Sequence, residues 1–169
     1  MKPLQSNCET HPIVSSFPKI NSFSHLVTCS SLKNELGIYD LDKQSWISKL
    51  DKKSSHSSGV FALTTYHGKL VSVSRDNSVK IWDLTSGKCV RTLRETTANI
   101  NCLKLLDKDR FGCGLSNKLI RIWDIKSGSC VLTLKGHDDS INCVEQLDNG
   151  DLVTGADDAS IRSRFLKLF

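Results

Sequence analysis

The residues best suited to nucleophilic catalysis are a histidine, a serine and an aspartate in the middle of the chain. His56, Ser72 and Asp76 provide a base, a hydroxyl and a carboxylate, the set that serine hydrolases use. Ser72, however, lies inside the apolar alternation LVSVS of residues 70–74, without the Gly-x-Ser-x-Gly turn that exposes a nucleophile. A similar set recurs further along the chain, at His137, Thr154 and Asp158. Recurrence is typical of architecture rather than of one catalytic site, so we expect no enzyme.

Metal and cofactor chemistry lack the motifs that they need. The seven cysteines include no Cys-x-x-Cys pair, which zinc sites commonly use. A phosphate-binding Gly-x-x-x-x-Gly-Lys loop is also absent from the sequence. Cys89 and Cys130 lie one sequence repeat apart, as do Cys102 and Cys143, which favours small buried side chains over disulfides. We expect no metal and no cofactor.

A sequence repeat organises the chain. Residues 75–93, RDNSVKIWDLTSGKCVRTL, recur as residues 116–134, SNKLIRIWDIKSGSCVLTL, at an offset of 41. A period of about 40–45 residues with Trp-Asp at the end of an apolar strand is typical of a propeller blade. Short runs of β-forming residues between turns predict an all-β chain. The predicted strands are residues 13–17, 26–30, 36–40, 46–50, 60–64, 70–74, 79–82, 89–93, 100–104, 111–114, 119–123, 130–134, 141–144 and 152–155, followed by a match at 160–162.

These motifs resemble the WD40-repeat β-propeller family over about residues 11–165. The resemblance implies four-stranded antiparallel sheets, or blades, each clamped by hydrogen bonds among a His, a Ser or Thr, an Asp and a Trp. The second repeat has all four, as His56, Ser72, Asp76 and Trp82. We expect the complete network only there.

The other repeats depart from the pattern. The fourth has His137, Thr154 and Asp158 but places Arg164 at the tryptophan position. The third keeps Trp123 but has different residues at the other positions, namely Thr96, Cys113 and Asn117. We expect a flexible segment at 1–10, then a WD-repeat propeller arc at 11–169 with repeats at about 11–50, 56–93, 96–134 and 136–169. Since four blades are at the lower end of the known range and the pattern fails after Arg162, we expect an incomplete propeller, closed by a second copy or by further blades.

The resemblance also suggests where partners bind. Propellers of this family contact proteins through the loops before their innermost strands and the turns after their second strands. The corresponding candidates are Ser58, Arg75, Asn99, Asn101, Ser116, Ser140, Asn142 and Asp157. The leading hypothesis is a non-catalytic scaffold that binds other proteins or peptides in a multiprotein complex. The alternatives are the substrate-recognition part of a ubiquitin ligase and an RNA-associated propeller.

Composition limits the remaining classes. The chain has 169 residues, of which 38% are hydrophobic and 24% charged, as in globular proteins. Its net charge of +5 is mild and spread along the sequence, so nucleic acid is not an expected partner. The longest apolar runs are strand-sized and the first residues are polar. We therefore expect no membrane association and a cytoplasmic or nuclear location.

Overall fold

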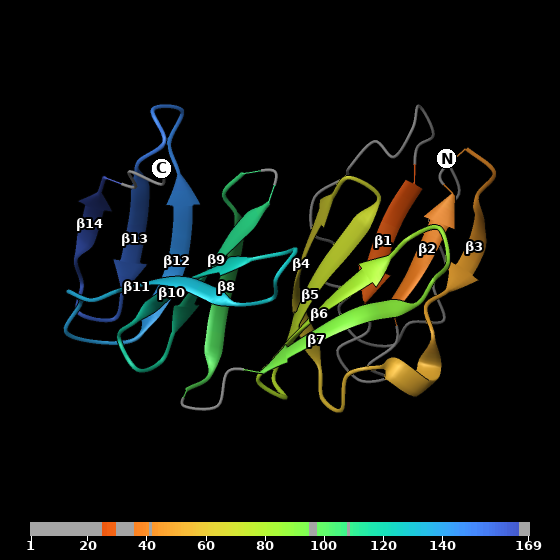
Figure 1. Cartoon of the computed structure of the whole chain (residues 1–169), viewed down its shortest axis with the longest axis horizontal. Helices are drawn as coiled ribbons and strands as arrows, with labels where there is room; N and C mark the ends of the chain where they lie inside the picture. Colours follow the sequence, from red (N-terminus) through yellow and green to blue (C-terminus); the bar gives the residue numbers. More distant parts are fainter. Residues whose placement is uncertain (1–24, 30–35, 41, 95–97, 108, 166–169) are drawn as a thin grey trace.

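The computed structural model describes residues 25–29, 36–40, 42–94, 98–107 and 109–165. These residues form antiparallel strands arranged in four sheets, which follow one another in chain order from one end of the molecule to the other (Figure 1). The prediction of an all-β fold built from four antiparallel sheets is confirmed. The expected strand at 13–17, the segment at 1–10 and Thr96 lie outside the described residues.

Each sheet is an antiparallel meander in which neighbouring strands are consecutive in sequence. The first sheet contains β1 (His25–Cys29), β2 (Leu36–Asp40) and β3 (Ser45–Lys49). A short 3-10 helix, η1 (Lys52–Ser54), leads to the second sheet, which contains β4 (Val60–Tyr66), β5 (Lys69–Ser74), β6 (Ser78–Asp83) and β7 (Cys89–Arg94). The third contains β8 (Ile100–Leu105), β9 (Arg110–Leu115), β10 (Ile120–Asp124) and β11 (Cys130–Leu134). The fourth contains β12 (Ile141–Gln146), β13 (Leu152–Ala156) and β14 (Ile161–Arg164).

Turn chemistry explains where the strands end. Gly87 and Gly128, between the third and fourth strands of their sheets, have φ of 69° and 72°, a conformation that glycine adopts without steric cost. The preceding aspartates help to close these turns, since Asp83 Oδ1 accepts hydrogen bonds from the Ser86 N–H and hydroxyl at 2.8 and 2.9 Å. The repeated Asp-x-x-Ser-Gly sequence therefore fixes the return into β7 and β11.

Three hydrophobic clusters join successive sheets. Between the first and second sheets, Leu36 and Ile38 pack with Leu70 and Trp82. The second and third sheets share a larger cluster that includes Val71, Val73, Ile81, Phe111, Cys113 and Trp123. The third and fourth share Leu106, Ile120, Ile122, Ile141, Val144 and Leu152. Because side chains alternate between the two faces of a strand, the second and third sheets each use one face toward the preceding sheet and the other toward the following sheet.

A register shift recurs at the start of three innermost strands. It falls between Val60 and Ala62 in β4, and at the equivalent places in β8 and β12. A β-bulge of this kind adds a residue to one strand and bends it. The pairing is equivalent on both sides of the shift, since Ile100 pairs with Leu115 as Val60 pairs with Ser74, and Leu103 pairs with Cys113 as Leu63 pairs with Ser72. β4 and β8 are therefore 40 residues apart and β5 and β9 are 41 apart, because the chain between paired residues of β8 and β9 is one residue longer than that between the equivalent residues of β4 and β5.

The close packing between the third and fourth sheets can be tested at a glycine. A Cβ atom at Gly114 would lie 2.6 Å from Cys102 Sγ and 2.6 Å from Ile141 Cγ2. Gly114→Ala should therefore lower the free energy of unfolding by about 1–3 kcal/mol through overpacking. Gly112, two residues earlier in β9, is a matched control, because the nearest atom to its added Cβ would be 3.4 Å away, an ordinary contact distance. Urea unfolding of both variants measures the difference, and equal losses would contradict this account.

Candidate functional site

A buried chain of polar side chains crosses the second sheet. His56 precedes β4, Ser72 lies in β5, Asp76 lies in the β5–β6 turn and Trp82 lies in β6. Trp82 Nε1 donates to Ser72 Oγ at 2.8 Å, and Ser72 Oγ lies 2.8 Å from His56 Nε2. On the other side of the ring, His56 Nδ1 lies 3.1 Å from Asp76 Oδ2. The structure thus brings together all four residues of the second repeat.

The protonation states follow from the surroundings. Burial lowers the pKa of His56, although the Asp76 carboxylate acts to raise it, so the ring is neutral at pH 7. Burial alone would raise the pKa of Asp76, but hydrogen bonds from the Ser78 hydroxyl and the Ser57 N–H lower it to about 2. A neutral ring beside a carboxylate carries its proton on Nδ1, so Nε2 accepts from the Ser72 hydroxyl. The hydrogen bonds then run in one direction, from the indole to the carboxylate.

This arrangement leaves Ser72 without the properties of a nucleophile. Its side chain is fully buried in the sheet, and its oxygen is held by the indole on one side and the imidazole on the other. A serine nucleophile needs a hydroxyl that a substrate can reach. The His, Ser and Asp of this chain therefore act as a structural set in the second sheet.

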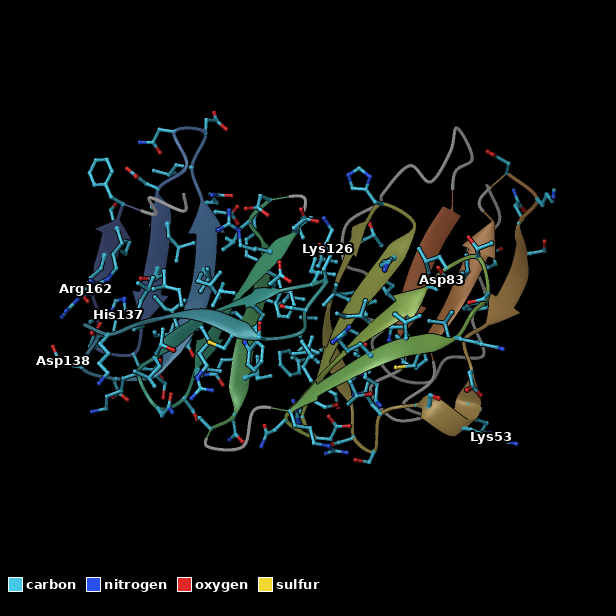
Figure 2. The ribbon with its side chains drawn as sticks, viewed as in Figure 1. Lys53, Asp83, Lys126, His137, Asp138 and Arg162 are labelled. Carbon is cyan, nitrogen blue, oxygen red and sulfur yellow. The ribbon has the colours of Figure 1, made fainter. Side chains whose placement is uncertain are left out.

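The fourth sheet contains part of the same network. His137 Nε2 lies 2.8 Å from Thr154 Oγ1, and His137 Nδ1 lies 2.8 Å from Asp158 Oδ2. Arg164 stands where the tryptophan would be, and its buried Nε has no hydrogen-bond partner within the described part of the chain. The neighbouring Arg162 instead bonds to the carbonyl of Gly136 and, through Nη2, to Asp138 at 3.0 Å (Figure 2).

In the third sheet the network is lost. Asn117 takes the aspartate position, and its buried Oδ1 has no hydrogen-bond partner among the described residues. Cys113 replaces the serine and joins the hydrophobic cluster with Trp123. The side chains of this sheet are therefore held by apolar packing where the second sheet uses hydrogen bonds.

Two serines belong to these networks although the sequence analysis did not include them. Ser78 Oγ donates to Asp76 Oδ1 at 2.6 Å, and Ser160 Oγ donates to Asp158 Oδ1 at 2.6 Å. Both stand two residues after their aspartate. This Asp-x-Ser spacing, absent after Asn117, was the available signal.

The candidate partner-binding residues gather where the innermost strands begin. A backbone hydrogen bond joins each of these starts to the turn after the second strand: Arg75 N–H to Gly59 O at 3.0 Å, Ser116 N–H to Asn99 O at 2.9 Å and Asp157 N–H to Ser140 O at 2.9 Å. The starts of β4, β8 and β12 lie along the lower edge in Figure 1. We call this edge the rim; it contains the candidates Ser58, Arg75, Asn99, Asn101, Ser116, Ser140, Asn142 and Asp157.

Side-chain hydrogen bonds connect the rim between the third and fourth sheets. Asn101 Nδ2 donates to the carbonyl of Ile141 at 3.1 Å and to Asn142 Oδ1 at 3.4 Å. Asn142 Nδ2 donates to Asp157 Oδ1 at 2.5 Å, and Ser140 Oγ donates to the carbonyl of Ser116 at 3.2 Å.

The second sheet contributes to the rim differently. Gly59, rather than Ser58, occupies the position of Asn99, because the repeat offset is 40 at this point. The carbonyl of Ser58 accepts a hydrogen bond from Ser74 Oγ at 2.9 Å. Arg75 is exposed.

The described ranges contain neither a metal-binding cluster nor a membrane-spanning helix. No group of three or more His, Cys, Asp or Glu side chains there could hold a metal ion. No helix there is long and apolar enough to cross a membrane.

The sequence profile described as "WD40: WD domain, G-beta repeat" matches residues 47–83, 87–124 and 128–163. The chain belongs to the WD40 repeat family. Each match combines the outermost strand of one sheet with the three inner strands of the next, so the sequence repeat of a WD40 chain overlaps two of its sheets.

Relatives match short parts of the chain. Cell division control protein 4 of Saccharomyces cerevisiae is 32% identical over 71 residues, which are 41% of this chain and 9% of that protein. Mitochondrial division protein 1 of Pyricularia oryzae is 45% identical over 40 residues, which are 24% of this chain and 6% of that protein. The matched segments thus span less than a tenth of the length of these relatives.

Two designed proteins share the fold. The computationally designed Ika4 protein superposes with a TM-score of 0.78 at 22% identity, covering 93% of this chain and 92% of that chain. The computationally designed Ika8 protein superposes with a TM-score of 0.77 at 23% identity, covering 94% of this chain and 48% of that chain.

Removing the central hydroxyl should destabilise the second sheet. Ser72→Ala leaves Trp82 Nε1 and His56 Nε2 buried without partners, so the free energy of unfolding should fall by about 2–5 kcal/mol. Thr154→Val is the comparison in the fourth sheet, since it leaves only His137 Nε2 without a partner among the side chains of the network, and should cost about 1–3 kcal/mol. Chemical denaturation measures both, and a smaller loss for Ser72→Ala would contradict the account.

The neutral state of His56 predicts a pH dependence. Below its ordinary pKa of 6.5, His56 gains a proton in the unfolded chain but not in the fold. Its contribution to stability should therefore be full above pH 6.5 and fall as the pH drops, by at most about 1.4 kcal/mol per unit.

His56→Gln tests this expectation. The variant should be less stable at pH 7.5, but its free energy of unfolding should fall less between pH 7 and 5 than that of the wild type. Gly114→Ala, which should lower stability without removing a histidine, should keep the wild-type slope. Urea unfolding at several pH values gives the slopes, and parallel curves for wild type and His56→Gln would contradict a neutral His56.

Proposed function

We propose that this WD40 chain is a non-catalytic scaffold that binds partner proteins through its rim. WD40 repeats indicate a protein-interaction propeller, and the fold presents the same pair of loops at the second, third and fourth sheets. Four of the rim candidates, Arg75, Asn99, Asn142 and Asp157, are exposed. The guanidinium and amide N–H groups donate hydrogen bonds, and the carboxylate and amide oxygens accept them, so the set can match both groups of a peptide main chain.

The observation that carries the proposal is the connection between the buried networks and the rim. Asp76 accepts a hydrogen bond from the Ser57 N–H at 2.8 Å, and Asp158 accepts one from the Asp138 N–H at 2.9 Å. In each sheet the aspartate belongs to the turn after the second strand, and the N–H belongs to the segment before the innermost strand. The network therefore fixes the two loops of the rim relative to each other. A binding surface held in this way loses less conformational entropy when a partner binds.

The absence of catalysis is part of the proposal. The set of His56, Ser72 and Asp76 has its serine and histidine buried within the second sheet, where it can stabilise the blade but cannot receive a substrate. The hydrogen bonds of this set stabilise the second sheet. Partner proteins are therefore bound by the exposed hydrogen-bonding groups of the rim.

A matched pair of double variants tests the proposal. Arg75→Glu with Asn142→Arg changes the rim, and Lys88→Glu with Thr85→Arg makes the same change of charge in the exposed β6–β7 turn at the other ends of the strands. Partners recovered by affinity purification and mass spectrometry should fall at least tenfold with the rim variant, which corresponds to about 1.4 kcal/mol. Recovery with the turn variant should stay within twofold of the wild type.

The remaining outcomes separate the alternatives. Undiminished recovery with the rim variant would contradict the proposed surface. RNA retention that falls steeply with salt would favour an RNA-associated propeller. Recovery of ubiquitin-ligase subunits, with substrates lost from the rim variant, would narrow the scaffold to substrate recognition.

A further inference from the structure

The outer face of the fourth sheet has an apolar side chain at a position that packs between sheets elsewhere in the chain, but no described residue covers it. The clearest sign is one repeat position, occupied by Leu36, Val79, Ile120 and Ile161 in the four sheets. The first three are 3%, 1% and 2% exposed because the following sheet covers them, whereas Ile161 is 80% exposed. Phe165, directly after β14, is 84% exposed. Apolar side chains at a position that packs between sheets three times over mark a face that accepts another sheet.

Exposure elsewhere has a simpler cause. Val90 in β7 and Val131 in β11 share a repeat position and are 52% and 50% exposed. They lie on the outermost strands, where this position is exposed in both sheets. Ile161 differs, because its equivalents in the other sheets are buried.

The opposite end of the chain presents the reverse kind of face. Trp82 and Trp123 face the preceding sheet and are buried. Tyr39 occupies the same position in the first sheet, and its ring meets the edge of Trp46 with 5.3 Å between ring centroids. Trp46 lies across Gly37 and is 56% exposed. The first sheet thus offers aromatic surface where a preceding sheet would pack.

The two faces are complementary halves of one interface that the chain already forms three times. The outer face of the fourth sheet, with Ile161, is the kind that packs on a following sheet. The outer face of the first sheet, with Tyr39 and Trp46, is the kind that packs on a preceding sheet. Two such faces on one chain lie at opposite ends of the row of sheets (Figure 1). They can meet only between copies or through added repeats.

The two designed structures indicate what larger arrangement four such sheets fit. The same four sheets superpose on 92% of the Ika4 chain and on 48% of the Ika8 chain, with TM-scores of 0.78 and 0.77. The four sheets of this chain are thus arranged like half of the Ika8 chain, which is about twice as long.

We propose that two copies of this chain associate head to tail. The outer face of the fourth sheet of each copy packs on the outer face of the first sheet of the other, which closes a ring of eight sheets. Such a pair has twofold symmetry, so both contacts are the same and neither end face remains uncovered.

Light scattering after size-exclusion chromatography tests the stoichiometry. At micromolar concentration the wild-type chain should have twice the mass of one chain, which is 18.8 kDa. Ile161→Asp should give the mass of one chain, because it places a charge in both contacts of the ring. Val131→Asp places the same charge at an equally apolar exposed site outside the two faces and should keep the double mass.

Tryptophan fluorescence tests which faces meet in the pair, and hydrogen exchange checks that the variant is folded. Trp46 is the exposed member of the three tryptophans, whereas Trp82 and Trp123 are buried within the chain. Association should shift the emission to shorter wavelength, and Ile161→Asp should shift it back although residue 161 lies at the other end of the molecule. Protection of β5 and β6 from hydrogen exchange should be the same in both chains, which shows that the variant is folded.

Three results would overturn the proposal. The first is a wild-type mass of one chain at micromolar concentration, which would leave the two faces to another protein or to further repeats. The second is a pair that persists in Ile161→Asp. The third is a pair whose dissociation leaves the emission unchanged, because the first sheet would then lie outside the contact.

Discussion

The structure depends on the packing of one sheet against the next. A β-sheet of alternating side chains has two faces, and in this chain both faces of the second and third sheets are apolar because a sheet lies on each side. Val71 faces the third sheet while Leu70 faces the first, and both are fully buried. No sheet of this kind is stable alone, so its stability belongs to the row of sheets.

The hydrogen-bond network of the second sheet joins this packing to the exposed rim. Trp82 is fully buried in the cluster between the first two sheets, yet its indole N–H begins a chain of hydrogen bonds that ends at Asp76 and the Ser57 N–H. Loosening the sheet contact would therefore also loosen the loops of the rim. A buried network of this kind stabilises the fold only when every group in it has a partner, which is why His56 and Ser72 occur together.

The sequence predicted the sheets well because their signals are local. The Trp-Asp pairs and the Ser-Gly turns mark where β6 and β10 end, and β2 was predicted at residues 36–40, its observed bounds. The shorter connection between β4 and β5 was not predicted, since it shows only in the pairing of the strands, and it places Gly59 where a constant offset of 41 puts Ser58. Which faces are covered also depends on contacts between sheets, so the exposure of Ile161 could only be seen in three dimensions.

The three contacts between successive sheets show that a hydrogen-bond network and apolar packing can substitute for each other. The third sheet has lost the histidine-centred network, but its contact with the second sheet contains the largest group of buried side chains, including Phe111 and Cys113. Replacing a whole set of hydrogen-bonded groups by apolar ones can be nearly neutral, whereas removing one partner is costly. The fourth sheet lies between these cases: His137 and Thr154 are paired, while Arg164 leaves a buried Nε without a partner in the described chain. The unpaired Nε lies in β14, the strand that contains Ile161, so this incomplete network destabilises β14. A sheet packed against the outer face of β14 would stabilise the strand.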